Sequence, residues 1–385
     1  MTAQIPLSLY IHIPWCEKKC PYCDFNSHLA KAEVDESAYI DALLKDLSED
    51  LQRYKEQIND RSLSSIFIGG GTPSLFSANS FKRLLNGVKE RIAFDGVIEI
   101  TSEANPGSSE ASKFEGFREA GVNRLSIGIQ SFNQNYLQAL GRVHNQSEAL
   151  KAAAYAKQAG FDNFNLDLMF GLPKQSHQHA VDDVMQAIEL GPSHLSCYQL
   201  TIEPNTLFHH RPPVTPDDEA LWGMQESIQA QLQKANYQQY EVSAYAQPSK
   251  RCAHNLNYWQ FGDYLGIGAG AHGKLTGVEG SVVRMWKIKH PANYLNPNKE
   301  FTGGVDTIEP AQQVFEFMMN ALRLREGFDL SLYEARTKQT KTDIDLHLNK
   351  HQSQGLIDIN NNWVVPTERG RQMLDSMLQD YLVEV

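Results

Sequence analysis

The sequence is poor in cysteine, in long hydrophobic runs and in positive charge, and each shortage excludes a class of protein. Five cysteines in 385 residues are too few for a disulfide scaffold. No window of about 18 apolar residues occurs, so we expect no membrane span. The formal net charge is −11, which argues against a nucleic-acid-binding surface because such surfaces usually carry a basic excess.

The first ten residues, MTAQIPLSLY, contain no basic segment followed by a long apolar run. We therefore expect no secretory signal. Together with the scarcity of cysteine, this favours a cytoplasmic, reducing compartment, in which thiols stay free to bind metal. A chain of this length is suited to two or three domains.

Short segments with many β-branched residues, bounded by Gly, Pro or Asn, alternate with amphipathic segments at a spacing of about 30 residues, the length of a βαβ unit. This pattern predicts parallel strands with right-handed crossovers. Polar motifs follow almost every strand, which favours an α/β barrel or a partial barrel of the (β/α)6 type over an open sheet. The predicted strands are Ser8–Pro14, Ser64–Gly71, Val97–Glu103, Arg124–Gln130, Asn163–Gly171, His194–Ile202 and Gln239–Ala246, and the clearest helices are Ala38–Tyr54, Asn79–Arg91 and Ser147–Ala159.

The pattern changes after Ala246, which predicts three parts: a barrel domain over 1–246, a linking segment over 247–309 and a C-terminal domain over 310–385. The last part resembles a small, mainly helical winged-helix domain. It lacks an evident basic recognition helix, so we interpret it as a structural or partner-facing module. Its predicted elements are helices at Ala311–Leu324, Thr342–Gln354 and Thr367–Tyr381, with a hairpin of Gly355–Asp358 and Trp363–Pro366.

Three of the five cysteines, Cys16, Cys20 and Cys23, form the pattern C-x3-C-x2-C directly after the first predicted strand. A disulfide pair with a spare thiol fits poorly with a reducing compartment. Three unrelated core cysteines fit poorly with a short loop that carries charged residues. A structural zinc site needs a fourth ligand, such as His12 or His28. An iron–sulfur cluster on three thiolates keeps one iron open, as a catalytic metal site does.

With Tyr22 directly before Cys23, the motif resembles that of the radical S-adenosylmethionine superfamily. The resemblance implies a full or partial α/β barrel and a 4Fe–4S cluster on Cys16, Cys20 and Cys23. It also implies S-adenosylmethionine as a second cofactor, chelating the open iron and yielding a 5′-deoxyadenosyl radical after electron transfer.

Later motifs, between about Ser8 and Leu207, resemble those of the oxygen-independent coproporphyrinogen III oxidases and their relatives. A Gly triplet permits close backbone approach to a ligand, the carboxylate of Asp167 inside an apolar run needs a partner such as a ribose diol, and Arg142 offers a fork for a carboxylate. The S-adenosylmethionine site implied by the resemblance comprises Tyr10, Tyr22, Gly70, Gly71, Thr72, Glu103, Gln130, Arg142 and Asp167.

Two features resemble the HemW branch of that family, the haem chaperones. Phe25 stands where the oxidases have a fourth cysteine, and the stretch from His254 to Trp259 reads H-N-x-x-Y-W. The resemblance implies haem contact, with histidine as a common axial ligand; the alternative is a core aromatic turn in which His254 only forms hydrogen bonds. The implied haem-contacting residues are His254, Asn255, Tyr258 and Trp259, with His272 as a further candidate.

The remaining two cysteines have plainer interpretations. Cys197 lies inside an apolar strand and is expected in the core. Cys252 is a free thiol next to the H-N-x-x-Y-W motif.

The resemblance implies a haem chaperone that binds a 4Fe–4S cluster, S-adenosylmethionine and haem and delivers haem to membrane haemoproteins. Its expected partners are haem-donor and haem-acceptor proteins associated with membranes, which would bring a cytoplasmic protein to the inner membrane surface. Two alternatives remain: oxidative decarboxylation of coproporphyrinogen III, and a zinc-containing interaction module.

Overall fold

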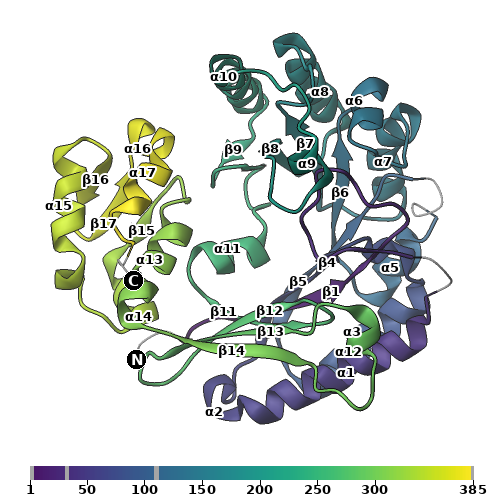
Figure 1. Ribbon diagram of the computed structural model, residues 1–385, viewed down its shortest axis with the longest axis horizontal. Coiled ribbons are helices and arrows are strands. Elements are labelled where there is room, and N and C mark those ends of the chain that lie inside the picture. The colour runs from purple at the N-terminus through teal and green to yellow at the C-terminus, as the bar shows by residue number, and fades with distance from the viewer. Residues whose placement is uncertain (1–3, 31–33, 108–111, 383–385) are drawn as a thin grey trace.

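The computed structural model describes residues 4–30, 34–107 and 112–382. Within these ranges, twelve strands form one mixed, curved sheet (Figure 1). The strand order is β14-β13-β12-β11-β1-β4-β5-β6-β7-β8-β10-β9. The strands are β1 (Leu7–Ile13), β4 (Leu63–Gly70), β5 (Phe94–Ala104), β6 (Arg124–Gln130), β7 (Phe164–Phe170), β8 (His194–Gln199), β9 (Gln238–Gln239), β10 (Ala244–Ala246), β11 (Asp263–Ile267), β12 (His272–Thr276), β13 (Val282–Lys287) and β14 (Thr302–Ile308).

The strands from β11 through β1 and β4 to β8 run parallel, and helices cover the outer face of the curved sheet (Figure 1). The edge strands β14 and β9 do not pair with each other in the described part of the chain, so the barrel is partial. This confirms the predicted fold class. The helices outside the C-terminal domain are α1 (Glu36–Arg53), α2 (Lys55–Ile58), η1 (Pro73–Leu75), α3 (Ala78–Arg91), α5 (Phe114–Ala120), α6 (Gln134–Ala139), α7 (Gln146–Gln158), α8 (His177–Leu190), α9 (Leu207–His210), α10 (Asp218–Lys234), α11 (Ala253–Trp259) and α12 (Pro291–Tyr294).

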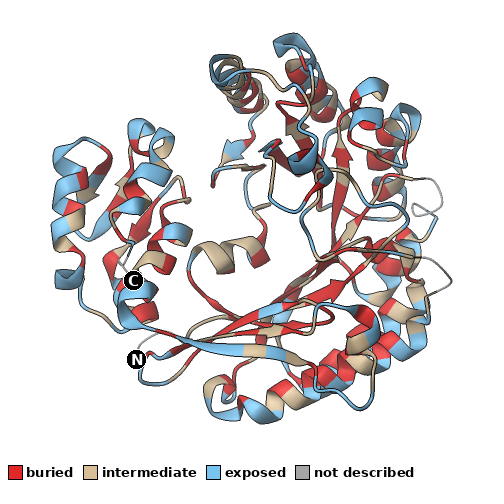
Figure 2. Cartoon of the chain, viewed as in Figure 1, coloured by how far each residue is buried: buried red, intermediate tan, exposed pale blue. Residues whose placement is uncertain are grey.

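The parallel strands are buried on both faces. Apolar residues occupy one face and mostly polar residues the other, so the two types alternate along the strands. In β1, Leu9 and Ile11 are fully buried in the main hydrophobic core, whereas Tyr10 and His12 line a cavity inside the curve. Successive strand residues point to opposite faces, so the apolar set packs under the helices and the polar set faces inward. Figure 2 shows the resulting pattern, with buried strands inside and exposed surface on the outer sides of the helices.

Six of the seven predicted strands are confirmed: β6 has the predicted bounds, and the ends of the other five shift by up to three residues. The seventh, Gln239–Ala246, is wrong: it divides into β9 and β10, which pair antiparallel. The Glu241 carboxylate stabilises the turn between them, because it accepts hydrogen bonds from the amide and hydroxyl of Ser243 at 3.0 and 2.8 Å. A single extended strand over this segment is therefore excluded.

The segment over 247–309 contributes directly to the sheet. Helix α11 lies on the concave side of the sheet, against β4 and β1 (Figure 1). Strand β11 then pairs parallel with β1, and β12, β13 and β14 extend the sheet antiparallel. The sequence predicted none of these elements, because no clear hydrophobic period marks them.

The C-terminal domain packs around a second hydrophobic core, which includes Phe317 and Tyr333 and extends to Phe261 and Val282 of the preceding segment, and it has a three-stranded sheet in the order β15-β17-β16. The predicted hairpin is confirmed. The predicted last helix is interrupted at Met373, and α14 was not predicted. The elements are α13 (Pro310–Ala321), β15 (Phe328–Asp329), α14 (Leu330–Thr337), η2 (Lys341–Asp343), α15 (Asp345–Ser353), β16 (Ile357–Asn360), β17 (Trp363–Pro366), α16 (Glu368–Gln372) and α17 (Leu374–Gln379).

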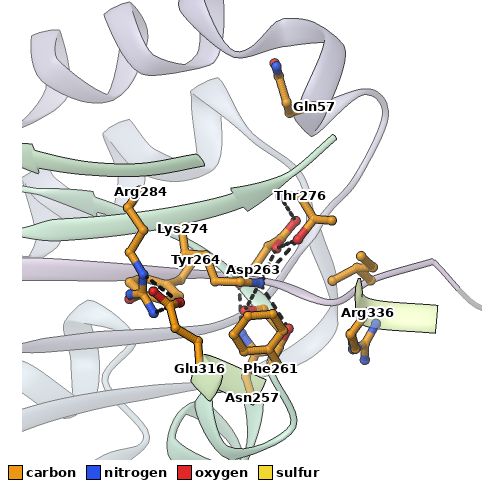
Figure 3. A network of polar contacts seen from close by, with 12 residues as sticks. Gln57, Asn257, Phe261, Asp263, Tyr264, Lys274, Thr276, Arg284, Glu316 and Arg336 are labelled. Carbon is orange, nitrogen blue, oxygen red and sulfur yellow. Dashed lines mark hydrogen bonds and ion pairs between the residues drawn. The ribbon is translucent and has the colours of Figure 1, made fainter. Parts of the chain in front are cut away.

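A polar network joins this domain to the sheet (Figure 3). Arg284 of β13 donates to the Glu316 carboxylate of α13 at 2.6 Å. Deeper in the same region, the buried carboxylate of Asp263 accepts from Lys274 at 3.0 Å and from Arg61 at 2.8 Å. The buried charges around Asp263 are paired, as burial requires, and the Arg284–Glu316 pair links α13 to β13. In the described ranges, every helix is too short or too polar to cross a lipid bilayer.

Candidate functional site

Two cavities adjoin inside the curve of the sheet. The first has a volume of about 550 Å³, and the second, between the barrel and α13, about 990 Å³. They share a wall that includes Cys23, Asp24 and Phe25. Both volumes lie within the range of ligand sites in proteins.

All three clustered cysteines line the first cavity, together with most of the residues predicted to bind S-adenosylmethionine. Most of these residues stand at the C-terminal ends of parallel strands or just after them, where α/β barrels place their sites, while Asp167 lies within β7 and Arg142 follows α6. The predicted residues that line it are Cys16, Cys20, Tyr22, Cys23, Gly70, Gly71, Thr72, Glu103, Gln130, Arg142 and Asp167.

The loop that carries the cysteines is held at both ends. A two-stranded bridge pairs β2 (Trp15–Cys16) with β3 (His28–Leu29). The Asn26 amide nitrogen donates to the carbonyls of Ala269 and Lys289, each at 2.8 Å, which ties the loop to the segments beside β12. Phe25 at the tip is 60% exposed. The loop is thus fixed in place while its thiols stay accessible.

The three thiols are close enough to influence each other. Burial raises the pKa of both Cys16 and Cys23, and the neighbouring thiols raise these values further. The guanidinium of Arg142 lies 3.8 Å from the Cys20 sulfur, where it would stabilise a thiolate. A 4Fe–4S cluster on three protein thiolates takes each sulfur to a different iron, so thiols that surround one cavity fit this group.

The zinc alternative requires ligands that converge on one ion. In residues 4–30, 34–107 and 112–382, no three His, Cys, Asp or Glu side chains are so arranged. One candidate fourth ligand, His12, has both ring nitrogens occupied, by the Tyr10 hydroxyl and the Asn26 carbonyl, each at 2.9 Å. The described side chains therefore do not form a preformed single-ion zinc site.

Gly70 and Glu103 meet at the mouth of the first cavity. The Gly70 amide donates to the Glu103 carboxylate at 3.0 Å. Gly70 has a φ of +114°, and a Cβ there would lie 2.5 Å from the His12 ring, so only glycine fits. Burial, and then repulsion from Asp167, raise the pKa of Glu103 to about 7. In residues 4–30, 34–107 and 112–382, the Glu103 carboxylate forms no ion pair, and a bound cation would supply a positive partner.

Arg142 and Asp167 already have protein partners. Arg142 donates to the Gly128 carbonyl at 2.9 Å and to the Asn105 side-chain oxygen at 2.5 Å. The Asp167 carboxylate accepts from the Ser126 hydroxyl at 3.0 Å and from the Asn165 amide at 2.8 Å. These bonds orient both charged groups toward the cavity that they line.

Gln130 ends β6 in an unusual conformation. Its φ is +68°, and the pairing of β6 with β7 shifts register between Gly128 and Gln130. Left-handed backbone is uncommon for residues other than glycine, and here it accompanies a bulge in the strand. The bulge places Gln130 in the wall of the first cavity.

Tyr10 differs from the other residues predicted to bind S-adenosylmethionine because it lines the second cavity and not the first, whereas Gly70 and Glu103 line both. There its hydroxyl lies 2.9 Å from the His12 ring.

Helix α11 carries the H-N-x-x-Y-W motif and divides its side chains among three environments. The Glu99 carboxylate accepts from the first backbone amides of the helix, at 3.1 Å from Ala253 and 3.2 Å from His254. Asn255 lines the first cavity, whereas Tyr258 and Trp259 line the second. The helix therefore contributes to the walls of both cavities.

His254 itself points into the protein and is 1% exposed. Its two ring nitrogens lie 3.0 Å from the Ser65 hydroxyl and 2.9 Å from the Tyr258 hydroxyl. Burial, and then the charge of Arg124, lower the pKa of His254 to about 3. The imidazole is neutral at physiological pH, and it holds Tyr258 in place.

Sequence reasoning missed several inward-facing polar residues of the first cavity. They alternate along β6, β7 and β8 with buried apolar residues, so the period-two pattern of strands was the signal that could have identified them. The residues are Arg124, Ser126, Asn165, His194, Ser196 and Tyr198.

Comparison with known proteins agrees with this arrangement. The family model of the radical SAM superfamily matches residues 10–187, and that of the HemN C-terminal domain matches residues 308–373. Over 383 residues the chain is 51% identical to the heme chaperone HemW of Haemophilus influenzae, covering 98% of each chain. The chain belongs to the HemW family. The Escherichia coli K12 relative of the same name is 49% identical over 380 residues, covering 98% of this chain and 99% of the relative.

Among solved structures, coproporphyrinogen III oxidase (HemN) from Escherichia coli, a radical SAM enzyme, superposes with a TM-score of 0.81. The match covers 98% of this chain and 90% of the oxidase at 22% sequence identity. At that identity the likeness establishes a shared fold. Membership of the HemW family rests on the sequence relatives and not on this superposition.

Proposed function

We propose that this HemW-family protein is a haem chaperone that holds a 4Fe–4S cluster and S-adenosylmethionine in the first cavity and haem in the second. The observation that carries the proposal is the pair of adjoining cavities: one is lined by three thiols, and the other has an aromatic wall and basic side chains. The names of the relatives support haem as the cargo.

Cys16, Cys20 and Cys23 would hold the cluster, and the open iron would accept the methionine end of S-adenosylmethionine, which supplies radical chemistry when bound. Gly70, Gly71 and Thr72 offer backbone groups at the same cavity. The carboxylates of Glu103 and Asp167 suit a cationic or hydroxyl-bearing ligand. Gln130 and Arg142 also line this cavity, with the Arg142 guanidinium beside the Cys20 sulfur.

For haem, we propose that α11 forms one wall of the site through Tyr258 and Trp259, with Asn255 at the neighbouring cavity. Arg323 stacks over the Trp259 ring at 4.3 Å, which fixes the indole plane. His254 supports this wall through its bond to Tyr258. Delivery to membrane-associated haemoproteins, from a cytoplasmic pool of carrier, completes the proposed role.

The cluster is tested on protein purified without oxygen and reconstituted with iron and sulfide. We expect about four irons per chain and an electron paramagnetic resonance signal of the reduced cluster that changes when S-adenosylmethionine is added. Cys20→Ala should lose this signal, whereas Cys197→Ala, in the core of β8, should keep it. Wild-type protein without iron would refute the cofactor assignment.

The carrier role is tested by titrating ferric haem and by offering haem-loaded protein to membranes that contain an apo-haemoprotein. We expect binding of one haem per chain and transfer to the acceptor. Incubation of the reconstituted protein with coproporphyrinogen III should yield no protoporphyrinogen IX. Turnover of that substrate would favour the oxidase alternative.

A further inference from the structure

The second cavity offers more than one histidine as a possible ligand for haem iron. His12, His28 and His272 line it. Both ring nitrogens of His12 are occupied, and the Nε2 atom of His28 lies 3.3 Å from the Asn26 side-chain oxygen. In the described part of the chain, the His272 ring has no hydrogen-bond partner. A metal ligand needs a free imidazole nitrogen, and His272 meets this condition best.

The surroundings of His272 suit a ligand. The side chain stands at the start of β12, directly opposite Trp286 of β13. The two rings are nearly parallel, at 28°, with centroids 6.4 Å apart, so the indole limits the orientations of the imidazole. The side chain is exposed, and the cavity gives it access to a bound molecule.

Electrostatics favour the same residue. Partial burial, and then the charges of Lys289 and Arg284, lower the pKa of His272. The imidazole is therefore neutral near pH 7, which is the state that binds metal. Acidic groups also line the cavity, namely Asp24, Glu103 and Glu203.

The cavity also matches the other parts of haem. Tyr258 and Trp259 provide aromatic surface for the porphyrin plane. Lys289 lines the cavity with an exposed side chain, and an ammonium there can pair with a propionate. Arg284 is already paired with Glu316, so Lys289 is the freer cation near His272.

His254 is placed differently. It lines neither cavity, and both of its nitrogens are bonded. An iron bond from His254 would require breaking one of these bonds and turning a buried ring outward. Its position suits a residue that orients Tyr258.

We infer that haem binds in the second cavity with its iron ligated by His272 and a propionate on Lys289, while His254 positions Tyr258 beside the porphyrin. This inference rests on the proposed haem-carrier function, and it names the ligand that the sequence motif does not. It also places haem directly across the Cys23–Phe25 wall from the cluster cavity.

The test uses full-length protein and ferric haem, with absorption and electron paramagnetic resonance spectra as readouts. Wild type should show a histidine-ligated haem at one equivalent. His272→Gly should lose this signature and regain it when free imidazole is added, because imidazole can fill the space left by the side chain. His28→Gly is the matched control on the same cavity and should keep the wild-type spectrum.

The remaining variants separate ligation from positioning. His254→Gln should retain the histidine-iron signature with weaker affinity, and Lys289→Met should weaken haem binding about 10-fold, the effect of one charged hydrogen bond. Retention of the wild-type spectrum by His272→Gly, or its loss in His254→Gln with rescue by imidazole, would overturn the inference. If wild type binds no haem at all, the proposed function itself fails, which is a different outcome.

Discussion

The pH dependence of S-adenosylmethionine binding follows from the environment of Glu103. Burial and the proximity of Asp167 raise its pKa to about 7, so the carboxyl group is ionised above that pH and protonated below it. S-adenosylmethionine carries a sulfonium and an ammonium group, and both prefer an ionised carboxylate. Affinity should therefore rise as the pH rises through about 7.

The size of the effect follows from the ionised fraction. With a pKa of about 7, roughly nine-tenths of Glu103 is ionised at pH 8 and roughly one-tenth at pH 6. The dissociation constant should thus be about 10-fold larger at pH 6 than at pH 8. Glu103→Gln should weaken binding at pH 8 by about 10–100-fold, which corresponds to a charged hydrogen bond of about 1.5–3 kcal/mol.

The assay is isothermal titration calorimetry of oxygen-free, cluster-reconstituted protein between pH 6 and pH 8.5. Glu103→Gln should show little pH dependence over this range, whereas Glu90→Gln, an exposed carboxylate on α3, should match wild type. A wild-type affinity that is flat with pH, or a Glu103→Gln variant with the wild-type slope, would refute the reasoning.

Two further predictions concern stability. Lys287→Met removes the buried ammonium that lies 2.6 Å from Asp46 and should lower the free energy of unfolding at pH 8 by about 3–5 kcal/mol. Because burial raises the pKa of Asp46 to about 6, its carboxyl group becomes neutral at lower pH, and urea unfolding at pH 5.5 should show a smaller loss. An equal loss at both pH values would contradict this prediction. Glu316→Gln should lower the free energy of unfolding by about 1.5–3 kcal/mol and speed proteolysis between the domains, because Arg284 loses its partner. Glu300→Gln, at an exposed carboxylate, is the control and should lower the free energy of unfolding by less than about 1 kcal/mol. Equal effects of Glu316→Gln and Glu300→Gln would contradict a role of the Arg284–Glu316 pair in holding the domains together.

The parallel strands were predictable because short β-branched runs and helical periods are local signals. β6, for example, has the same bounds in the structure as in the prediction, Arg124–Gln130. The strand β11 escaped prediction because its pairing partner β1 lies more than 250 residues earlier in the chain. The pair β9 and β10 also escaped, because a single side chain, Glu241, folds the turn between them.

The local order of residues by itself determined the cysteine motif, the polar ends of the strands and the aromatic helix motif, because each depends on spacing along one element. Only the tertiary structure decided which of these residues share a cavity. On α11, one helical turn directs His254 inward toward Ser65 while Tyr258 and Trp259 face the second cavity. His272 reaches that cavity through the pairing of β12 with β13. The face that a side chain occupies depends on the register of its strand or the rotation of its helix. Contacts between residues distant in the chain set the register and the rotation.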